Sequence, residues 1–265
     1  MLALIAGRGA LPIAIAGAQP QPALICALED SGPDRLEVDL WFRLETLGSL
    51  IEALRARGVT RICMAGGIRR PQVDPAALDA ATLPLVPALT AALQAGDDGA
   101  LRAVIGIFED AGFAVQPAQE AAPDLLMAEG IPTEAQPGTR HRADAARGAQ
   151  IVAAMGAADV GQACAVLNGQ ALAIEGLFGT DWMLASLALR PDGGEGGLLY
   201  KAPKPGQDRR ADLPTIGPDT VRGAAGAGLE GIVIEAGGVI VLDRAGVIAA
   251  CDRMGLFLWS RGRQG

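Results

Sequence analysis

The first half of the chain alternates between short apolar runs and stretches in which apolar residues recur with the period of a helix. Strands are predicted over residues 2–6 and 23–28, which are continuous apolar runs, and over residues 59–65, which are mostly apolar. Helices are predicted over residues 11–17, 46–57, 83–95 and 98–111. Strands that alternate with helices in this way are typical of a parallel, doubly wound sheet, so we expect a Rossmann-like α/β domain here.

The second half has a more mixed pattern. Strands are predicted over residues 163–167, 172–175, 198–200, 232–234, 239–242 and 256–259. Helices are predicted over residues 143–158, 180–189, 218–227 and 244–254. Asn168-Gly169 separates the first two strands, and this dipeptide is a strong signal for a tight hairpin because both residues tolerate positive φ. A mixed α/β domain is therefore expected.

A break between the halves lies at residues 129–142, which hold two prolines and two glycines and show no apolar period. We therefore predict a Rossmann-like nucleotide- and substrate-binding domain over residues 1–130 and a linker over 131–142. A C-terminal α/β catalytic domain would then span residues 143–265. His141 falls in the predicted linker and is expected to be solvated.

Composition excludes several classes of function. The chain of 265 residues has 22 basic and 30 acidic residues and a net charge of −8, which argues against a nucleic-acid-binding groove. With one histidine and no Cys-x-x-Cys pair, a zinc site or disulfide framework is not expected, and the four cysteines read as buried, reduced thiols. No apolar run is long enough to span a membrane. Gly7-Arg8-Gly9 interrupts the first run and no basic residue precedes it, which favours strand, turn and helix over an export signal.

Both lysines of the chain, Lys201 and Lys204, stand in one unusual segment at residues 200–217. Three prolines and two glycines prevent a regular helix there, so we expect a loop held by its contacts. The loop carries four cations and two carboxylates, a combination that suits a diphosphate with a divalent metal. A solvated loop whose charges cancel is the alternative.

A second candidate binding element is the Gly7-x-Gly9 turn between the first strand and helix, where backbone N–H groups would attract a phosphate. Glu29-Asp30 follows the second strand, where an acid could hold a ribose hydroxyl. Proline stands at position 12 in place of the third glycine of a dinucleotide fingerprint, so a turn that serves only packing is the alternative. Gly66 ends the third strand and belongs to the same predicted edge.

Two helix starts carry acids or hydroxyls that could cap the helix or contact phosphate or metal. Thr180 and Asp181 follow Gly179 at one start, and Asp98 lies at the other. Both interpretations are open at this point.

Several short motifs occur together and in order. They lie at residues 4–12, 96–98, 179–184, 201–205 (KAPKP), 212–217 (DLPTIG) and 227–232. In this combination the chain resembles the LpxI-type UDP-2,3-diacylglucosamine pyrophosphatases. The resemblance extends over nearly the whole chain, and the KAPKP and DLPTIG pair is its most specific part.

The resemblance implies hydrolysis of the diphosphate of UDP-2,3-diacylglucosamine to UMP and 2,3-diacylglucosamine 1-phosphate, in lipid A biosynthesis. It further implies Mg²⁺ as cofactor, two domains that hold the lipid nucleotide, a homodimer, and a cytoplasmic protein that acts at the inner membrane surface as a peripheral protein. Asp212 occupies the position of the family's key catalytic aspartate.

We therefore expect the following roles. Asp212 would be the catalytic carboxylate, acting as a metal ligand or as a base that orients water, and Asp181 would be a second carboxylate. Lys201 and Lys204 would neutralise the diphosphate. Substrate contacts are expected from Gly7, Gly9, Gly66, Asp98, Thr180 and Thr215. The rival functions are an NAD(P)-type Rossmann oxidoreductase, suggested by the glycine turn, and a non-catalytic nucleotide-lipid binding protein.

Overall fold

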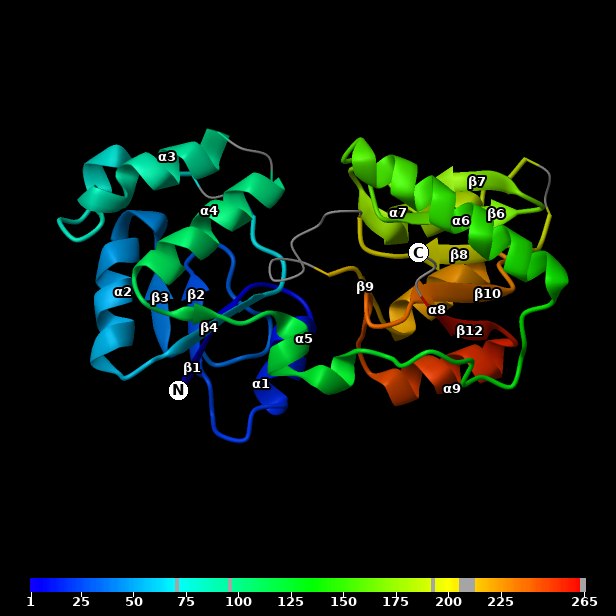
Figure 1. Cartoon of the computed structure of the whole chain (residues 1–265), viewed down its shortest axis with the longest axis horizontal. Helices are drawn as coiled ribbons and strands as arrows, with labels where there is room; N and C mark the ends of the chain where they lie inside the picture. Colours follow the sequence, from blue (N-terminus) through cyan, green and yellow to red (C-terminus); the bar gives the residue numbers. More distant parts are fainter. Residues whose placement is uncertain (70–71, 95–96, 192–193, 205–212, 263–265) are drawn as a thin grey trace. The chain divides into compact units, whose positions relative to one another are not determined.

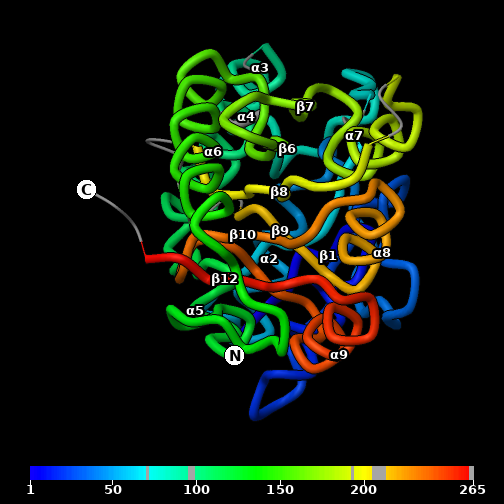
Figure 2. Tube along the Cα trace, turned by 90° about the vertical axis from the view of Figure 1, so that its right-hand side faces the viewer, coloured from blue at the N-terminus to red at the C-terminus, as the bar shows by residue number. Residues whose placement is uncertain are grey.

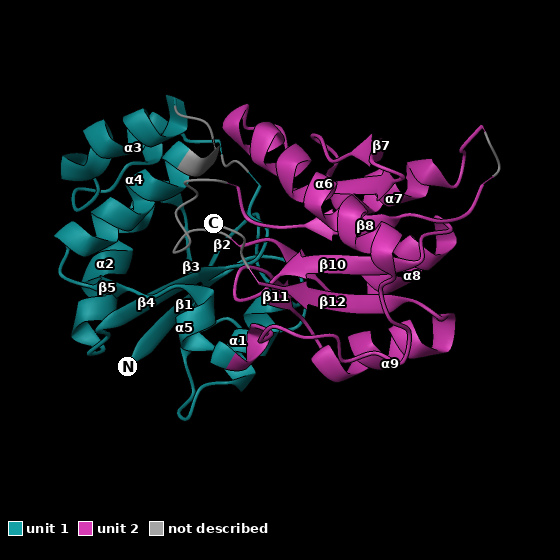
Figure 3. Cartoon of the chain, turned by 45° about the vertical axis from the view of Figure 1, so that its right-hand side comes forward, with its two compact units in different colours: residues 1–123, 208–212 teal, residues 124–207, 213–265 magenta. Residues whose placement is uncertain are grey.

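The chain is described by a computed structural model, which covers residues 1–69, 72–94, 97–191, 194–204 and 213–262 (Figure 1). These residues form two compact units, residues 1–123 and residues 124–204 with 213–262 (Figure 3). The segment 131–142, assigned above to a linker, lies in the second unit. Backbone hydrogen bonds between Gly130 and Ser260 hold the start of this segment to that unit's sheet.

A five-stranded parallel sheet forms the first unit, with strand order β3-β2-β1-β4-β5. Its strands are β1 (Leu2–Ala6), β2 (Leu24–Leu28), β3 (Leu40–Phe42), β4 (Arg61–Ala65) and β5 (Ala114–Val115). This order is that of a doubly wound Rossmann-type sheet, so the predicted α/β fold class is confirmed. The edge strands β3 and β5 were not predicted because three and two residues are too short to show a period.

Helices cover the first unit's sheet. They are α1 (Leu11–Gly17), α2 (Leu47–Ala56), α3 (Val86–Gln94), α4 (Asp97–Asp110) and α5 (Ala118–Ala121), with 3₁₀ turns at Leu44–Thr46, Pro75–Ala77, Leu83–Leu85 and Pro123–Leu125. The predicted apolar face of α2 is buried against Ala3 and Ile5 of β1, which point to the same core. Leu2 and Leu4 of β1 are also buried, so both faces of the sheet are covered.

The two glycine turns of the first unit meet at the carboxyl ends of β1 and β4. The Gly7 amide donates to the carbonyl of Ala65 at 2.8 Å, and Arg8 and Gly67 exchange two backbone hydrogen bonds. A Cβ on Gly7 would lie 2.6 Å from the carbonyl oxygen of Gly67, and one on Gly66 would lie 2.7 Å from that of Arg8. Glycine is therefore required at both positions by the close approach of the turns.

The second unit is built on a mixed sheet with strand order β12-β10-β8-β6-β7. Its strands are β6 (Ala163–Leu167), β7 (Gln170–Ile174), β8 (Leu198–Lys201), β10 (Gly231–Glu235) and β12 (Phe257–Arg261), and β9 (Thr215–Ile216) pairs with β11 (Ile240–Val241). Asn168 and Gly169 adopt φ values of 51° and 75°, and β6 and β7 are antiparallel, so the predicted hairpin is confirmed.

Helices lie on both faces of this second sheet (Figure 2). Helix α6 (Thr139–Ala157) covers one face, and α7 (Gly179–Leu187), α8 (Pro218–Gly226) and α9 (Arg244–Met254) cover the other. Side chains of β8 alternate between them: Leu198 and Tyr200 join the core under α6, and Leu199 joins the core under α7–α9. This alternation directs Lys201, the last residue of β8, to the side of α7–α9.

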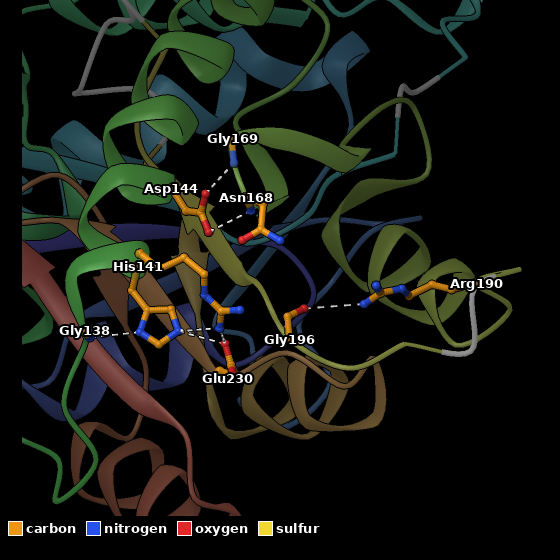
Figure 4. A network of polar contacts seen from close by, with 9 residues as sticks. Gly138, His141, Asp144, Asn168, Gly169, Arg190, Gly196 and Glu230 are labelled. Atoms are coloured by element: carbon orange, nitrogen blue, oxygen red, sulfur yellow. Dashed lines mark hydrogen bonds and ion pairs between the residues drawn. The ribbon is translucent and has the colours of Figure 1, made fainter.

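His141 is not the solvated linker residue that was expected. Helix α6 begins at Thr139, and the Nδ1 atom of His141 accepts the Gly138 backbone N–H at 3.0 Å (Figure 4). Its Nε2 atom lies 2.8 Å from a carboxylate oxygen of Glu230, and its ring packs on Phe257. Because Nδ1 accepts the backbone N–H, the proton of the neutral ring sits on Nε2 and is donated to Glu230.

Replacing Gly7 by Ala should weaken the first unit, because the new methyl group meets backbone at 2.6 Å that cannot move alone. We expect a loss of about 1–3 kcal/mol in the free energy of unfolding, measured by urea denaturation with amide exchange at β1 and β4. Gly17→Ala is the matched control in the same unit, since no atom outside its own helix turn lies within 4 Å of its added Cβ. Equal stability of the two variants would contradict this account of the turns.

Stability should also depend on the ionised form of Glu230. Partial burial works to raise the pKa of this carboxyl, but the hydrogen bond from His141 and the charge of Arg140 hold the pKa below its usual 4.5. A lowered pKa in the folded state stabilises the fold above pH 4.5, and the contribution is lost as the pH falls through the folded value. As the pH is lowered from 6 to 3, the melting temperature of Glu230→Gln should therefore fall less than that of the unmodified protein. Glu52→Gln, at an exposed position of α2, is the control, and its melting temperature should fall as much as that of the unmodified protein.

Candidate active site

Lys201 is a buried cation at the carboxyl end of β8, with 7% of its surface exposed. Its ammonium group donates to the hydroxyl of Thr180 at 2.8 Å and to the backbone carbonyl of Thr215 at 3.0 Å. A buried ammonium group is stable only when such acceptors replace its water shell. The position of Lys201 is therefore determined by α7 and β9 as well as by its own strand.

Glu175 supplies the opposite charge. This carboxylate directly follows β7, is 7% exposed, and accepts the hydroxyl of Thr180 at 2.6 Å and the backbone N–H of Gln162 at 2.8 Å. Thr180 thus accepts from Lys201 and donates to Glu175, which joins the two charges through one hydroxyl group. We call Lys201, Thr180, Glu175 and Thr215 the lysine cluster.

Strand directions explain why these residues meet. Strands β7 and β8 both run antiparallel to β6, so their carboxyl ends lie at the same edge of the sheet. Lys201 pairs with Ala163, and the Glu175 amide donates to the carbonyl of the same residue at 2.9 Å. Open α/β sheets bind ligands at this edge.

The structure shows whether Thr180 caps the start of α7. Phe178 is the N-cap residue and no side chain caps the helix, while the hydroxyl of Thr180 is directed to Glu175. The capping interpretation of Thr180 is therefore wrong. Asp181 lies in the first turn of α7 and is exposed.

Glu175 was missed as a site residue by sequence reasoning. Its only signal is an acid at the end of an apolar strand, five residues before Thr180. Three candidates, Lys201, Thr180 and Thr215, are brought together by the fold. Lys204 instead forms an ion pair with Asp159 at 2.6 Å, and this hydrogen bond lowers the pKa of the Asp159 carboxyl.

The glycine turn of the first unit already has an anionic partner. The Gly9 amide, at a φ of +97°, donates to the carboxylate of Asp34 at 3.0 Å. A phosphate at this amide would have to displace Asp34. Gly7 and Gly66 lie side by side, as predicted for one sheet edge, and their backbones contact each other.

Two predicted residues cannot be placed. Asp212 lies outside the described residues, and Asp98 is described only as a backbone position in α4. Within the described ranges, no group of three or more His, Cys, Asp or Glu side chains could hold a metal ion.

The four cysteines are free and buried, as predicted. Burial raises the pKa of Cys26, Cys63 and Cys164 to about 12 and that of Cys251 to about 11. At neutral pH these thiols are protonated and poor nucleophiles.

Comparison with known families covers both units. The LpxI N-terminal domain family matches residues 1–125, and the LpxI C-terminal domain family matches residues 128–259. The chain belongs to the LpxI family. The resemblance inferred from the motifs is thereby confirmed, and the two LpxI domains correspond to the two structural units.

A curated relative extends this assignment. The chain is 38% identical over 270 residues to the UDP-2,3-diacylglucosamine pyrophosphatase LpxI of Caulobacter vibrioides, which covers 97% of this chain and 96% of the relative. The lysine cluster, the KAPKP motif and the DLPTIG motif all fall within the LpxI C-terminal domain match.

Removing the Thr180 hydroxyl should damage the lysine cluster. Thr180→Val keeps the side-chain shape but leaves Lys201 and Glu175 without the group that links them, so we expect a loss of about 1–3 kcal/mol in unfolding free energy. Thr180→Ser retains the hydroxyl and is the matched control, expected to keep most of the stability. Thermal denaturation of both variants distinguishes loss of the hydrogen bonds from loss of the methyl group.

Proposed function

We propose that this LpxI-family protein hydrolyses the diphosphate of UDP-2,3-diacylglucosamine and releases UMP and 2,3-diacylglucosamine 1-phosphate, a step of lipid A biosynthesis. The observation that carries the proposal is the match to a pyrophosphatase of that name over nearly the full length of both chains. A glycine turn whose amide is already bonded to Asp34 gives no comparable support to a nicotinamide-dependent oxidoreductase.

The lysine cluster supports the chemistry of this proposal. Hydrolysis of a diphosphate requires that negative charge on the phosphate oxygens be neutralised, and a buried cation does this more strongly than a solvated one. Lys201 is held as such a cation by Thr180 and Thr215, and Glu175 orients Thr180. In our proposal Lys201 faces the diphosphate, and Thr180 and Thr215 position substrate and lysine together.

Asp212 is proposed as the catalytic carboxylate. It would orient the attacking water and accept its proton while the P–O bond to the leaving phosphate breaks. Asp181, exposed in the first turn of α7, is proposed as the second carboxylate. Lys204 would add positive charge by exchanging Asp159 for a substrate phosphate.

Mg²⁺ is proposed as cofactor. Mg²⁺ is commonly held by one or two carboxylates together with substrate phosphates and water, so a preformed cage of ligands is not needed. The described residues contain no cage of three or more acidic, cysteine or histidine ligands, which is compatible with this mode. Asp212 would supply the carboxylate, and the ion would neutralise charge that develops on the diphosphate.

The first unit is proposed to contribute to substrate binding through Gly7, Gly9, Gly66 and Asp98. We further propose a homodimer, located in the cytoplasm and bound peripherally at the inner membrane, where a diacylated substrate resides. None of the described helices combines the length and hydropathy needed to cross a bilayer.

The proposal predicts Mg²⁺-dependent release of UMP from UDP-2,3-diacylglucosamine, followed by chromatography. Chelation of the metal should abolish the release, and added Mg²⁺ should restore it. Asp212→Ala should lower the rate by at least about a thousandfold while substrate still binds, because the carboxylate acts on the transition state. Asp208→Ala, four residues earlier in the sequence, is the matched control and should keep most of the activity. No UMP from folded protein under any divalent metal would refute the hydrolase, and a binding protein would then be the better interpretation.

A further inference from the structure

Helix α7 exposes apolar side chains where a surface helix normally exposes polar ones. Leu177 and Phe178, just before the helix, are 93% and 69% exposed, and Trp182 and Leu189 are 59% and 83% exposed. Asp181 is the only charged residue among the exposed positions of residues 177–189. We call Leu177, Phe178, Trp182 and Leu189 the α7 patch.

The opposite side of the same helix is also apolar. Met183, Leu184 and Leu187 are buried in the core between α7–α9 and the sheet. Figure 2 shows these three helices on the same side of the sheet. Exposed apolar surface is costly in water, so large apolar side chains on the outer side of α7 and at its two ends are expected to be covered by another surface. The ring centroids of Phe178 and Trp182 lie 5.5 Å apart, so the exposed aromatic groups form one continuous surface.

We propose that the α7 patch docks onto the surface of a lipid bilayer. The choice of a bilayer rests on the proposed function, since a diacylated substrate is a membrane component. Phe178 stands two residues before Thr180, whose hydroxyl contacts Lys201. Docking by this patch would place the lysine cluster close to the surface from which the substrate must be drawn.

A bilayer fits the patch better than a second copy of the chain. Helix α7 has nine residues and is about 13 Å long. Its outer side is therefore small beside the area of about 800 Å² that each partner of a stable dimer buries. Trp and Phe are the side chains that favour the boundary between lipid headgroups and acyl chains. The net charge of −8 and the presence of Asp181 oppose attraction to anionic lipids, so binding should come from apolar insertion and depend little on salt.

The test is sedimentation of the full chain with phosphatidylcholine vesicles and with vesicles that contain phosphatidylglycerol, at low and high salt. We expect the unmodified chain to bind both kinds, with a blue shift of its tryptophan fluorescence. Phe178→Ser/Trp182→Ser should lower the vesicle partition coefficient by at least about tenfold. Trp41→Ser is the matched control, since Trp41 of the first unit is 53% exposed and lies outside the patch.

Equal vesicle binding by the double variant and the control, or absence of binding by the unmodified chain, would overturn the inference. A lipid-free dimer that dissociates only in the double variant would overturn it too, because the patch would then be an interface between copies. UMP release from detergent-dispersed substrate separates this inference from the proposed function. Vesicle binding without UMP release refutes only the hydrolase, and UMP release without vesicle binding refutes only the docking surface.

Discussion

The cost of burying the Lys201 ammonium group is the constraint on which the second unit's sheet edge depends. A charge removed from water must be compensated by nearby acceptors and a counter-charge. Here the acceptors come from α7 and β9, and the counter-charge comes from Glu175 at the end of β7. The end of the β6–β7 hairpin, the start of α7 and the strands β8 and β9 must therefore meet at Lys201. In the proposed function, the same buried cation would neutralise negative charge on the diphosphate.

The carboxyl edges of the two sheets differ in the groups that occupy them. In the first unit the edge is closed by backbone, because Gly7 and Gly66 allow the turns after β1 and β4 to touch, and Asp34 holds the Gly9 amide. In the second unit the edge carries side-chain charges. The acidic chain uses lysine at only two positions, Lys201 at the end of β8 and Lys204 just after it, so both lysines lie at the end of this strand. Ammonium and guanidinium groups are not equivalent at a phosphate, since only the ammonium acts as a compact point charge.

Helix α7 lies between the lysine cluster and the exposed α7 patch, and it contributes residues to both. Its buried side packs in the core and its first turn places Thr180 against Lys201. Its outer side and the residues at its two ends carry the α7 patch. One rigid element thereby joins the groups suited to a diphosphate and the groups suited to acyl chains. An amphiphilic substrate presents these same two chemistries within one molecule.

The sequence by itself determined the alternating pattern, the Rossmann-type order of elements, the Asn168-Gly169 hairpin and the family motifs, because each depends on local periodicity or on residues close in the chain. The strands β3, β5 and β9 have only two or three residues, so pairing with a neighbouring strand, and not the sequence pattern, decides them. Tertiary structure alone brought Glu175 to Lys201 through Thr180, since the direction of β7 relative to β8 decides which strand ends meet. It also placed His141 against Glu230 and Phe257, and residues 124–138 on the second unit, because proline- and glycine-rich composition does not reveal which sheet a segment pairs with.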